Sequence, residues 1–363
     1  MNVGFVLLSY QRDAPAGMER SVAGLLRGLS ALGHRGVVLS ASPEAVGDSD
    51  VVPIRSLVVR FPSDDTRLRV AIQRAVGLEE EVESILRHHA IDIVCYVDAL
   101  WGMGRRLLTT GSFRTVLAVH VVGHRVDLEA ALCRNPAAVL APSRSVLEQA
   151  ARQDYDTARW KVVPNSLLTE QDQAPCVAAR EARRRSGPIR AIARLGPEKG
   201  ILPLLTSTPA NRYRATEVAV ALAGFERDPG SQRRLLEECR AAATSRGIKV
   251  LPGLPWDGVA PFLASASVTL VPSRSETFGL VALESMSVGT PVVAFAVGNF
   301  PDLVGGAGAL VPQAAGTAGL WRAARDLLAD PVRYRAASRA GLARAEPYRP
   351  AAVAEEWMEA VLL

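Results

Sequence analysis

Residues 273–294 read SRSETFGLVALESMSVGTPVVA, and no other stretch indicates the fold and the chemistry of the chain as clearly. The pattern predicts the end of a strand, then a loop that carries Glu276, then a helix that opens at Gly279 and holds Glu284 in its second turn. A strand that runs through a short loop into a helix is the repeating unit of α/β folds. The loop and the start of the helix together form a candidate site.

The start of this helix is suited to phosphate binding. The first N–H groups of a helix have no partner within the helix, and the helix dipole adds partial positive charge there. The backbone of Gly279, Leu280 and Val281 can therefore bind a phosphate without any side chain. Glu284 has little structural reason to lie on this mostly apolar segment; the alternative is a glutamate that faces solvent or caps the helix.

Short apolar runs alternate with helix-like segments along the whole chain, which predicts buried parallel strands covered by helices on both faces. In the first half the strand candidates are Val3–Leu8, Gly36–Ser40, Leu57–Phe61, Ile91–Val97, Thr115–His120, Val139–Pro142 and Lys161–Pro164. In the second half they are Ile189–Arg194, Glu217–Ala223, Ile248–Leu251, Val268–Pro272, Pro291–Ala296 and Ala309–Pro312. A polar, charged stretch between Leu168 and Pro188 predicts an interdomain linker, and Ala351–Leu363 has the spacing of an amphipathic helix.

The composition is that of a globular protein with two domains. The chain has 363 residues, of which 48% are apolar and 22% charged. Its net charge of +5 comes without a basic stripe interleaved with aromatic residues, so we expect no nucleic acid partner. The four cysteines lack the paired spacing of zinc ligands. The N-terminal run is typical of a first strand rather than a signal peptide, and no run of 18 apolar residues occurs, so a cytoplasmic location is expected.

A second candidate binding segment overlaps the end of a strand candidate and reads ARLGPEKG at residues 193–200. Arg194 and Lys199 lie five positions apart, and two cations at such a loop can both reach one diphosphate, Arg by its fork and Lys as a point charge. The alternative is a solvated turn. Because the Gly-Lys-Ser/Thr ending of a P-loop is absent, ATPase chemistry is disfavoured.

Residues 273–294 resemble the Glu-x7-Glu signature of retaining glycosyltransferases of family 4. Two glutamates eight positions apart are common by chance in any sequence. The flanking Phe-Gly-Leu, Leu-Glu and Gly-Thr-Pro-Val-Val therefore carry the resemblance as much as the acids do. The Arg194-x4-Lys199 segment resembles the phosphate-binding segment of the same family.

Two N-terminal segments and one C-terminal segment resemble the family with departures. Gly17 stands where the family has a Gly-Gly pair before an acidic residue, and Ala16 replaces the other glycine. His120 ends the fifth strand candidate and resembles the donor-contacting histidine of the family, without its usual polar follower. Asn299 stands where the family commonly has Gly.

The resemblance implies the GT-B architecture, an α/β fold of two Rossmann-like domains whose parallel sheets face a central cleft. Residues 1–168 would form the acceptor domain, to which residues 346–363 would return as a helix packed on it. Residues 187–345 would form the donor domain.

The resemblance also implies the site. The catalytic candidates are Glu276, Arg194, Lys199 and His120, and the donor-binding candidates are Gly17, Glu284, Phe278, Gly279, Leu280, Val281, Leu251 and Gly253. The cations, Gly17 and the helix start would stabilise charge on the departing diphosphate in place of a metal. Glu276 would hold sugar hydroxyls, Glu284 the ribose and the backbone near Leu251 the base, while His120 would face the sugar.

No metal and no cofactor are expected; the nucleotide sugar is a substrate. His120 and His124 are four apart, but the Val-Val-Gly between them is not helical, so they do not form a metal pair. Asp48-Ser49-Asp50 has the form of a metal-binding Asp-x-Asp but lies in a Gly/Ser loop and indicates a solvated turn.

The expected reaction moves a hexose or aminohexose from a UDP-sugar to a hydroxyl of an acceptor, such as a small secondary metabolite. Three alternatives remain open: an epimerase or phosphorylase on the same architecture, a non-catalytic binder of nucleotide sugars, and a membrane-peripheral transferase with a lipid acceptor. The last would use the arginines around residues 55–74, where interspersed Asp64 and Asp65 favour a solvated face instead. The sugar, the base, the acceptor and the oligomeric state are not determined by the sequence.

Overall fold

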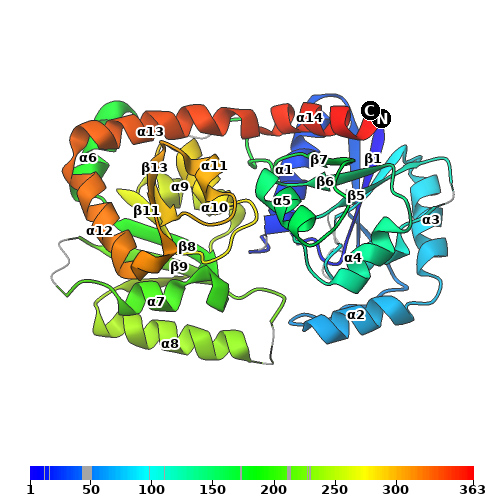
Figure 1. Cartoon of the computed structure of the whole chain (residues 1–363), viewed down its shortest axis with the longest axis horizontal. Coiled ribbons are helices and arrows are strands. Elements are labelled where there is room, and N and C mark those ends of the chain that lie inside the picture. The colour runs from blue at the N-terminus through cyan, green and yellow to red at the C-terminus, as the bar shows by residue number, and fades with distance from the viewer. Residues whose placement is uncertain are drawn as a thin grey trace. The chain divides into compact units, whose positions relative to one another are not determined.

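The computed structural model describes residues 1–11, 13–15, 17–42, 51–97, 99–109, 111–171, 174–210, 214–226, 228 and 230–363. The chain forms two compact units, each an α/β unit of its own (Figure 1). Unit 1 comprises Met1–Glu170, Gly224–Pro229 and Tyr348–Leu363, and unit 2 comprises Gln171–Ala223 and Gly230–Pro347.

Within the described residues, unit 1 holds one seven-stranded sheet in the order β3-β2-β1-β4-β5-β6-β7, with every pair parallel. Its strands are β1 (Asn2–Leu7), β2 (Arg35–Ser40), β3 (Val51–Pro53), β4 (Ile93–Tyr96), β5 (Arg114–Ala118), β6 (Ala138–Ala141) and β7 (Trp160–Val162). Most of their residues are buried, β1 and β4 almost entirely, as expected of a sheet covered on both faces.

The helices of unit 1 are α1 (Gly17–Ala31), α2 (Asp65–Arg74), α3 (Leu78–His88), α4 (Arg125–Leu132), α5 (Arg144–Arg152) and α14 (Pro350–Leu362), with a 3-10 turn η2 at Met103–Arg106. Local sequence starts two of them. Asp64 accepts a hydrogen bond from Arg67 N to cap α2, and Ser143 accepts one from Val146 N to cap α5.

The last helix of the chain, α14, packs on the first, α1, within unit 1. Gly28 of α1 lies so close to α14 that a Cβ there would be 2.0 Å from the carbonyl oxygen of Pro350. Trp357 of α14 is buried, with its ring 5.8 Å from that of Phe5 on β1. Helix α14 is thus part of the core of unit 1.

Residues 224–226 also belong to unit 1 although they lie between a strand and a helix of unit 2 in the sequence. Ser63 N donates to Gly224 O at 2.8 Å, and Glu226 N donates back to Ser63 O at 3.0 Å. The ring of Phe225 lies 5.1 Å from that of Trp101.

Within the described residues, unit 2 holds one six-stranded parallel sheet in the order β10-β9-β8-β11-β12-β13. Its strands are β8 (Ile189–Arg194), β9 (Thr216–Ala221), β10 (Lys249–Pro252), β11 (Val268–Val271), β12 (Val292–Phe295) and β13 (Gly308–Val311). The chain runs outward from β8 to β10 and then returns to β11 beside β8. This reversal is the Rossmann order, with its switch point between β8 and β11.

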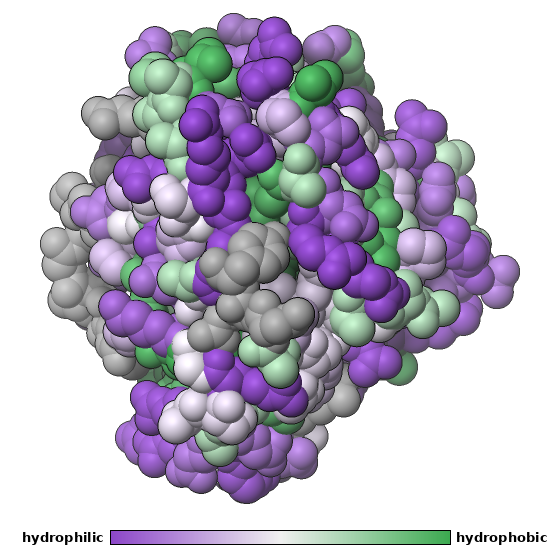
Figure 2. Space-filling view, turned by 90° about the vertical axis from the view of Figure 1, so that its left-hand side faces the viewer, coloured by the Kyte–Doolittle hydropathy of each residue, from purple (hydrophilic) through white to green (hydrophobic). Residues whose placement is uncertain are grey.

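The helices of unit 2 are α6 (Val177–Ser186), α7 (Ile201–Thr206), α8 (Ser231–Ser245), α9 (Trp256–Ala264), α10 (Leu280–Ser287), α11 (Phe300–Val304), α12 (Gly316–Ala329) and α13 (Pro331–Ala345), with 3-10 turns η3 (Pro197–Lys199), η4 (Gln313–Ala315) and η5 (Glu346–Tyr348). Figure 2 shows one face of unit 2, which is mostly hydrophilic with scattered hydrophobic patches. Among the described residues, no helix is both long and apolar enough to cross a membrane.

One strand prediction is wrong. Leu57–Phe61 is not a strand; the edge strand β3 lies at Val51–Pro53 instead. Leu57 and Val59 are buried and alternate with exposed Val58 and Arg60, so the segment has the burial of a strand, but within the described part of the chain it pairs with no strand. Alternation reports which side chains are buried, not whether the backbone has a neighbour to pair with.

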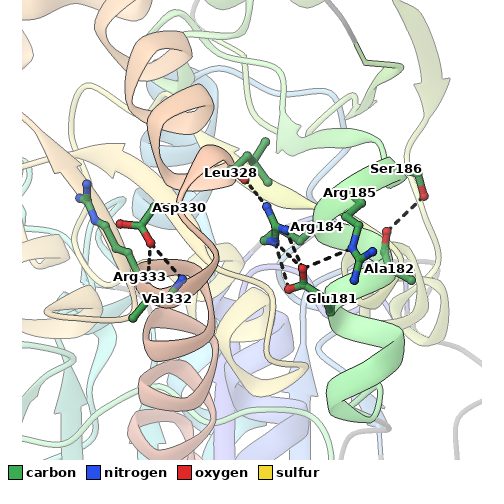
Figure 3. Close-up of polar contacts among 9 residues, drawn as sticks. All are labelled: Glu181, Ala182, Arg184, Arg185, Ser186, Leu328, Asp330, Val332 and Arg333. Carbon is green, nitrogen blue, oxygen red and sulfur yellow. Dashed lines mark hydrogen bonds and ion pairs between the residues drawn. The ribbon is translucent and has the colours of Figure 1, made fainter.

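The predicted linker between Leu168 and Pro188 contains helix α6. Its charges pair along the helix: Arg184 and Arg185 both contact Glu181, at 2.6 and 3.4 Å (Figure 3). The bond from Arg184 lowers the pKa of Glu181. Arg184 also donates to the carbonyl of Leu328 at 2.6 Å, while nearby Asp330 caps α13. The polar stretch is thus helical, and several of its charged side chains are paired along the helix or bonded to a carbonyl of a neighbouring element.

Candidate active site

The candidate residues of unit 2 gather at the carboxyl edge of its sheet, at the switch point. Arg194 is the last residue of β8, and Glu276 lies in the loop after the neighbouring strand β11. In open α/β sheets the carboxyl ends of the strands at the switch point border the ligand crevice. The two motifs, far apart in the sequence, therefore meet where such sheets bind ligands.

Two ion pairs join the predicted cations to glutamates. Lys199 Nζ lies 2.8 Å from Glu276 Oε2, and both side chains are largely buried. Arg194 Nη2 lies 2.8 Å from Glu198 Oε1, and this pair is more exposed. Sequence reasoning did not single out Glu198 as a partner. The i,i+4 spacing of Arg194 and Glu198 was the available signal, but that spacing favours contact only in a helix, and Arg194 ends a strand.

Backbone contacts hold the two loops of this site together. Gly200 has a left-handed backbone, φ 66°, and a Cβ there would lie 2.2 Å from the carbonyl oxygen of Pro272. Arg274 N donates to Glu198 O at 2.8 Å. The loop after β8 and the loop after β11 thus form one connected backbone frame, on which Lys199 and Glu276 face each other.

Helix α10 begins at this frame. Gly279 precedes it with φ 107°, a conformation that favours glycine, and a Cβ there would lie 2.7 Å from the ring of Phe300. Phe278 is buried, whereas Leu280 and Val281 are half-buried, so the first turn of the helix reaches the surface. Its first N–H groups lack partners from an earlier helical turn, and α10 presents the positive end of its dipole here.

Glu284 lies on the second turn of α10 and is only 7% exposed. The alternative of a solvent-facing glutamate is therefore wrong. Leu251 and Gly253 lie at the end of β10, which β9 separates from β8, roughly 10 Å along the same edge of the sheet. Leu251 is half-buried and Gly253 is exposed.

In unit 1, His120 follows β5, which ends at Ala118; the prediction that His120 ends the strand is off by two residues. The side chain borders a small cavity of about 40 Å³ whose lining includes Ser21, Asn165 and Trp357. Burial lowers the pKa of His120 to about 4, so its imidazole is neutral at pH 7. A neutral ring can accept or donate a hydrogen bond but carries no charge to stabilise a phosphate.

Gly17 is the first residue of α1, directly after the loop at the carboxyl end of β1. Glu19 follows in the first turn and is buried, and its carboxylate accepts a hydrogen bond from Ser9 Oγ at 2.7 Å. Burial raises the pKa of Glu19 despite this bond. Ala16, the departure from the Gly-Gly pair, lies outside the described residues.

The remaining candidates concern metals. His124 Nε2 pairs with Asp65 at 2.6 Å. Asp48-Ser49-Asp50 lies outside the described residues. Among the residues that the structure does describe, no three His, Cys, Asp or Glu side chains are grouped as metal ligands.

Family models match both halves of the chain. The model described as Glycosyltransferase Family 4 matches residues 15–171, and the model described as Glycosyl transferases group 1 matches residues 189–330. A D-inositol 3-phosphate glycosyltransferase from Acidothermus cellulolyticus is 37% identical over 162 residues, which is 40% of this chain and 35% of that protein. The chain thus aligns with about a third of the length of such curated relatives.

Solved structures share the fold over the whole chain. Sucrose-phosphate synthase from Thermosynechococcus elongatus has a TM-score of 0.77 at 20% identity, covering 99% of this chain and 97% of that one. HepE from Anabaena, solved in complex with UDP-glucose, has a TM-score of 0.74 at 17% identity, covering 100% and 99%. At these identities the similarity establishes the fold, two Rossmann-like domains of GT-B type.

Proposed function

Because the chain belongs to the glycosyltransferases of family 4 and group 1, we propose that it is a retaining enzyme that transfers a hexose or aminohexose from a UDP-sugar to an acceptor hydroxyl. The observation that carries this proposal is the Lys199–Glu276 pair beside the start of α10, at the switch point of the sheet. It places a cation, a helix dipole and a carboxylate within one frame. A diphosphate and the sugar attached to it need these three groups side by side.

The cations would serve the leaving group. As the glycosidic bond breaks, negative charge grows on the diphosphate, and preorganised positive groups stabilise that charge most effectively. Lys199 would exchange Glu276 for a phosphate oxygen, and Arg194 would do the same with Glu198. The N–H groups at the start of α10 and the backbone at Gly17 would add further donors.

The two glutamates would bind different parts of the donor. Glu276, released from Lys199, would accept hydrogen bonds from sugar hydroxyls, and Glu284 would accept those of the ribose. The backbone near Leu251 and Gly253 would contact the base, and neutral His120 would offer a hydrogen bond to the sugar. The similarity to an enzyme named for D-inositol 3-phosphate supports a small hydroxylated acceptor.

We expect activity to survive chelation, because the fixed cations and the helix start would take the role that a metal has in other transferases. Transfer would be measured after exhaustive dialysis against EDTA, beside a transferase known to need Mn²⁺ as the control for complete chelation. Loss of transfer in EDTA with recovery in Mn²⁺ would show that a metal is required.

Two measurements test the proposed reaction. Thermal shift against UDP, GDP and ADP should single out UDP, since a ligand at 100 times its dissociation constant adds about 2.7 kcal/mol of stability. NMR of the product from an α-linked UDP-sugar should then show an α-linkage. If none of the three nucleoside diphosphates stabilises the protein, the proposal of a nucleotide-sugar donor is wrong. A β-linked product would contradict the proposed retention of configuration.

A further inference from the structure

Residues 298–300, where the connection from β12 enters α11, lie directly against the loop that carries Glu276. Gly298 has a left-handed backbone, φ 53°, and a Cβ there would lie 1.8 Å from the carbonyl oxygen of Glu276. Two backbones approach this closely only if one of them is glycine. Next to it, Asn299 N donates to that same carbonyl oxygen at 3.3 Å.

The side chain of Asn299 makes a second contact with the same loop. Its Nδ2 donates to the carbonyl oxygen of Phe278 at 2.9 Å, and the residue is only 6% exposed. The following residue, Phe300, packs its ring against Gly279. Consecutive residues from 298 to 300 thus hold the carbonyls of Glu276 and Phe278 and the turn into α10. A glycine at position 299 would keep the backbone bond but lose the side-chain bond.

The carboxylate of Glu276 has a different tie, to Lys199, and the proposed function breaks it. When a diphosphate takes Lys199, Glu276 loses its 2.8 Å partner at the moment when it must meet the sugar. The backbone of its loop then still has the contacts of Asn299, which bonds to the carbonyl oxygens on both sides of Thr277.

We propose that Asn299 is a positioning residue that sets the sugar affinity of this site through Glu276. This inference rests on the proposed function, in which Glu276 binds the sugar. Its effect is specific: Asn299 should matter for the sugar part of the donor and little for the nucleoside diphosphate, which the cations and the helix start would bind.

Asn299→Gly and Asn299→Asp test the proposal. The first removes the side chain, and the second keeps its shape but places a carboxylate against the Phe278 carbonyl. Calorimetry with UDP and UDP-glucose as probes should show UDP affinity within about twofold of the wild type. Affinity for UDP-glucose should fall about five- to tenfold, the size expected for one neutral hydrogen bond.

Ser338→Ala is the matched control. Ser338 Oγ also makes a buried bond to a backbone carbonyl, that of Gly289 at 2.7 Å, just beyond the far end of α10. This variant should lower the melting temperature of the protein without changing the ratio of the two affinities. A change of that ratio in Ser338→Ala equal to that in the Asn299 variants would reduce Asn299 to a general stabilising residue and overturn the proposal.

Hydrogen exchange of the unliganded protein tests whether Asn299 holds the loop of Glu276 in the absence of a donor. Amides of residues 277–280 should exchange faster in both Asn299 variants and at the wild-type rate in Ser338→Ala. Unchanged exchange in the Asn299 variants, or faster exchange with an unchanged affinity ratio, overturns the inference and leaves the proposed function standing. A wild-type protein that does not bind UDP at all overturns the proposed function instead, and the sugar role of Asn299 with it.

Discussion

At the scale of single residues, the two glutamates of the signature occupy different environments. Glu276 lies in a loop and is paired with Lys199, whereas Glu284 is buried on the helix behind it. If Glu284 binds the ribose as proposed, we expect Glu284→Ala to weaken UDP and UDP-sugar binding alike, by about 1.5–3 kcal/mol, because charged hydrogen bonds would be lost. Glu276→Ala should weaken only the UDP-sugar, since it leaves Lys199 free for the diphosphate. Calorimetric titration of both ligands measures the difference.

Circular dichroism of both variants is the control for folding. If both substitutions weaken UDP equally, the division of roles between the two glutamates is wrong, and the start of α10 is what recognises the donor.

Lys199 provides a second prediction at this scale. Its charge should matter most as the diphosphate departs, so Lys199→Ala should lower kcat by more than it raises KM for the UDP-sugar. Lys249→Ala is the matched control, because Lys249 is exposed at the opposite end of edge strand β10. Steady-state kinetics in which Lys199→Ala keeps the wild-type kcat would remove Lys199 from the mechanism.

At the scale of elements, helix α10 depends on a buried arginine of α6. Arg180 donates to the carbonyls of Ala264, Ala266 and Val288 at 3.0, 2.9 and 2.8 Å, where helices α9 and α10 end. Burial lowers the pKa of Arg180. The carbonyl groups at the C-terminal ends of α9 and α10 nevertheless stabilise its positive charge, since helix C-termini favour cations. We expect Arg180→Met to lower the free energy of unfolding by about 3 kcal/mol, because three carbonyls lose their donor and two of these bonds are buried.

Denaturant unfolding measures this loss, and Arg183→Met, at an exposed position of the same helix, is the control. Equal stability of the two variants would show that the hydrogen bonds of Arg180 do not stabilise unit 2.

At the scale of the whole molecule, each unit has a hydrophobic core of its own, and apolar residues of α14 at the chain end are buried within unit 1. We expect Trp357→Ala to lower the stability of unit 1 by about 3–5 kcal/mol, as is usual for a buried aromatic ring. Scanning calorimetry should show that the variant lowers the melting temperature of unit 1. Added UDP should raise the melting temperature of unit 2, which identifies that transition. Glu355→Ala, at an exposed position of α14, should change neither. A shift of both transitions in Trp357→Ala would show that the units unfold as one.

Much of the fold follows from local patterns. The apolar run of β8 is bounded by Pro188 on one side and by Leu-Gly-Pro on the other, so its predicted limits agree with the structure. The loop and helix of residues 273–294 were predictable for the same reason, since a strand, a glycine and a helical period lie next to one another. Family membership also follows from this stretch, because its motif residues are contiguous.

Pairings between distant residues needed the tertiary structure. Lys199 meets Glu276 only because β11 returns beside β8, and no periodicity in the sequence states that order. Asn299 departs from the family pattern, and only the approach of β12 and its loop reveals a partner, the carbonyl of Phe278. Local sequence determines where strands and helices lie, because propensity and turn residues act over a few positions. Which side chains meet depends on the strand order and on burial, and these are properties of the whole folded chain.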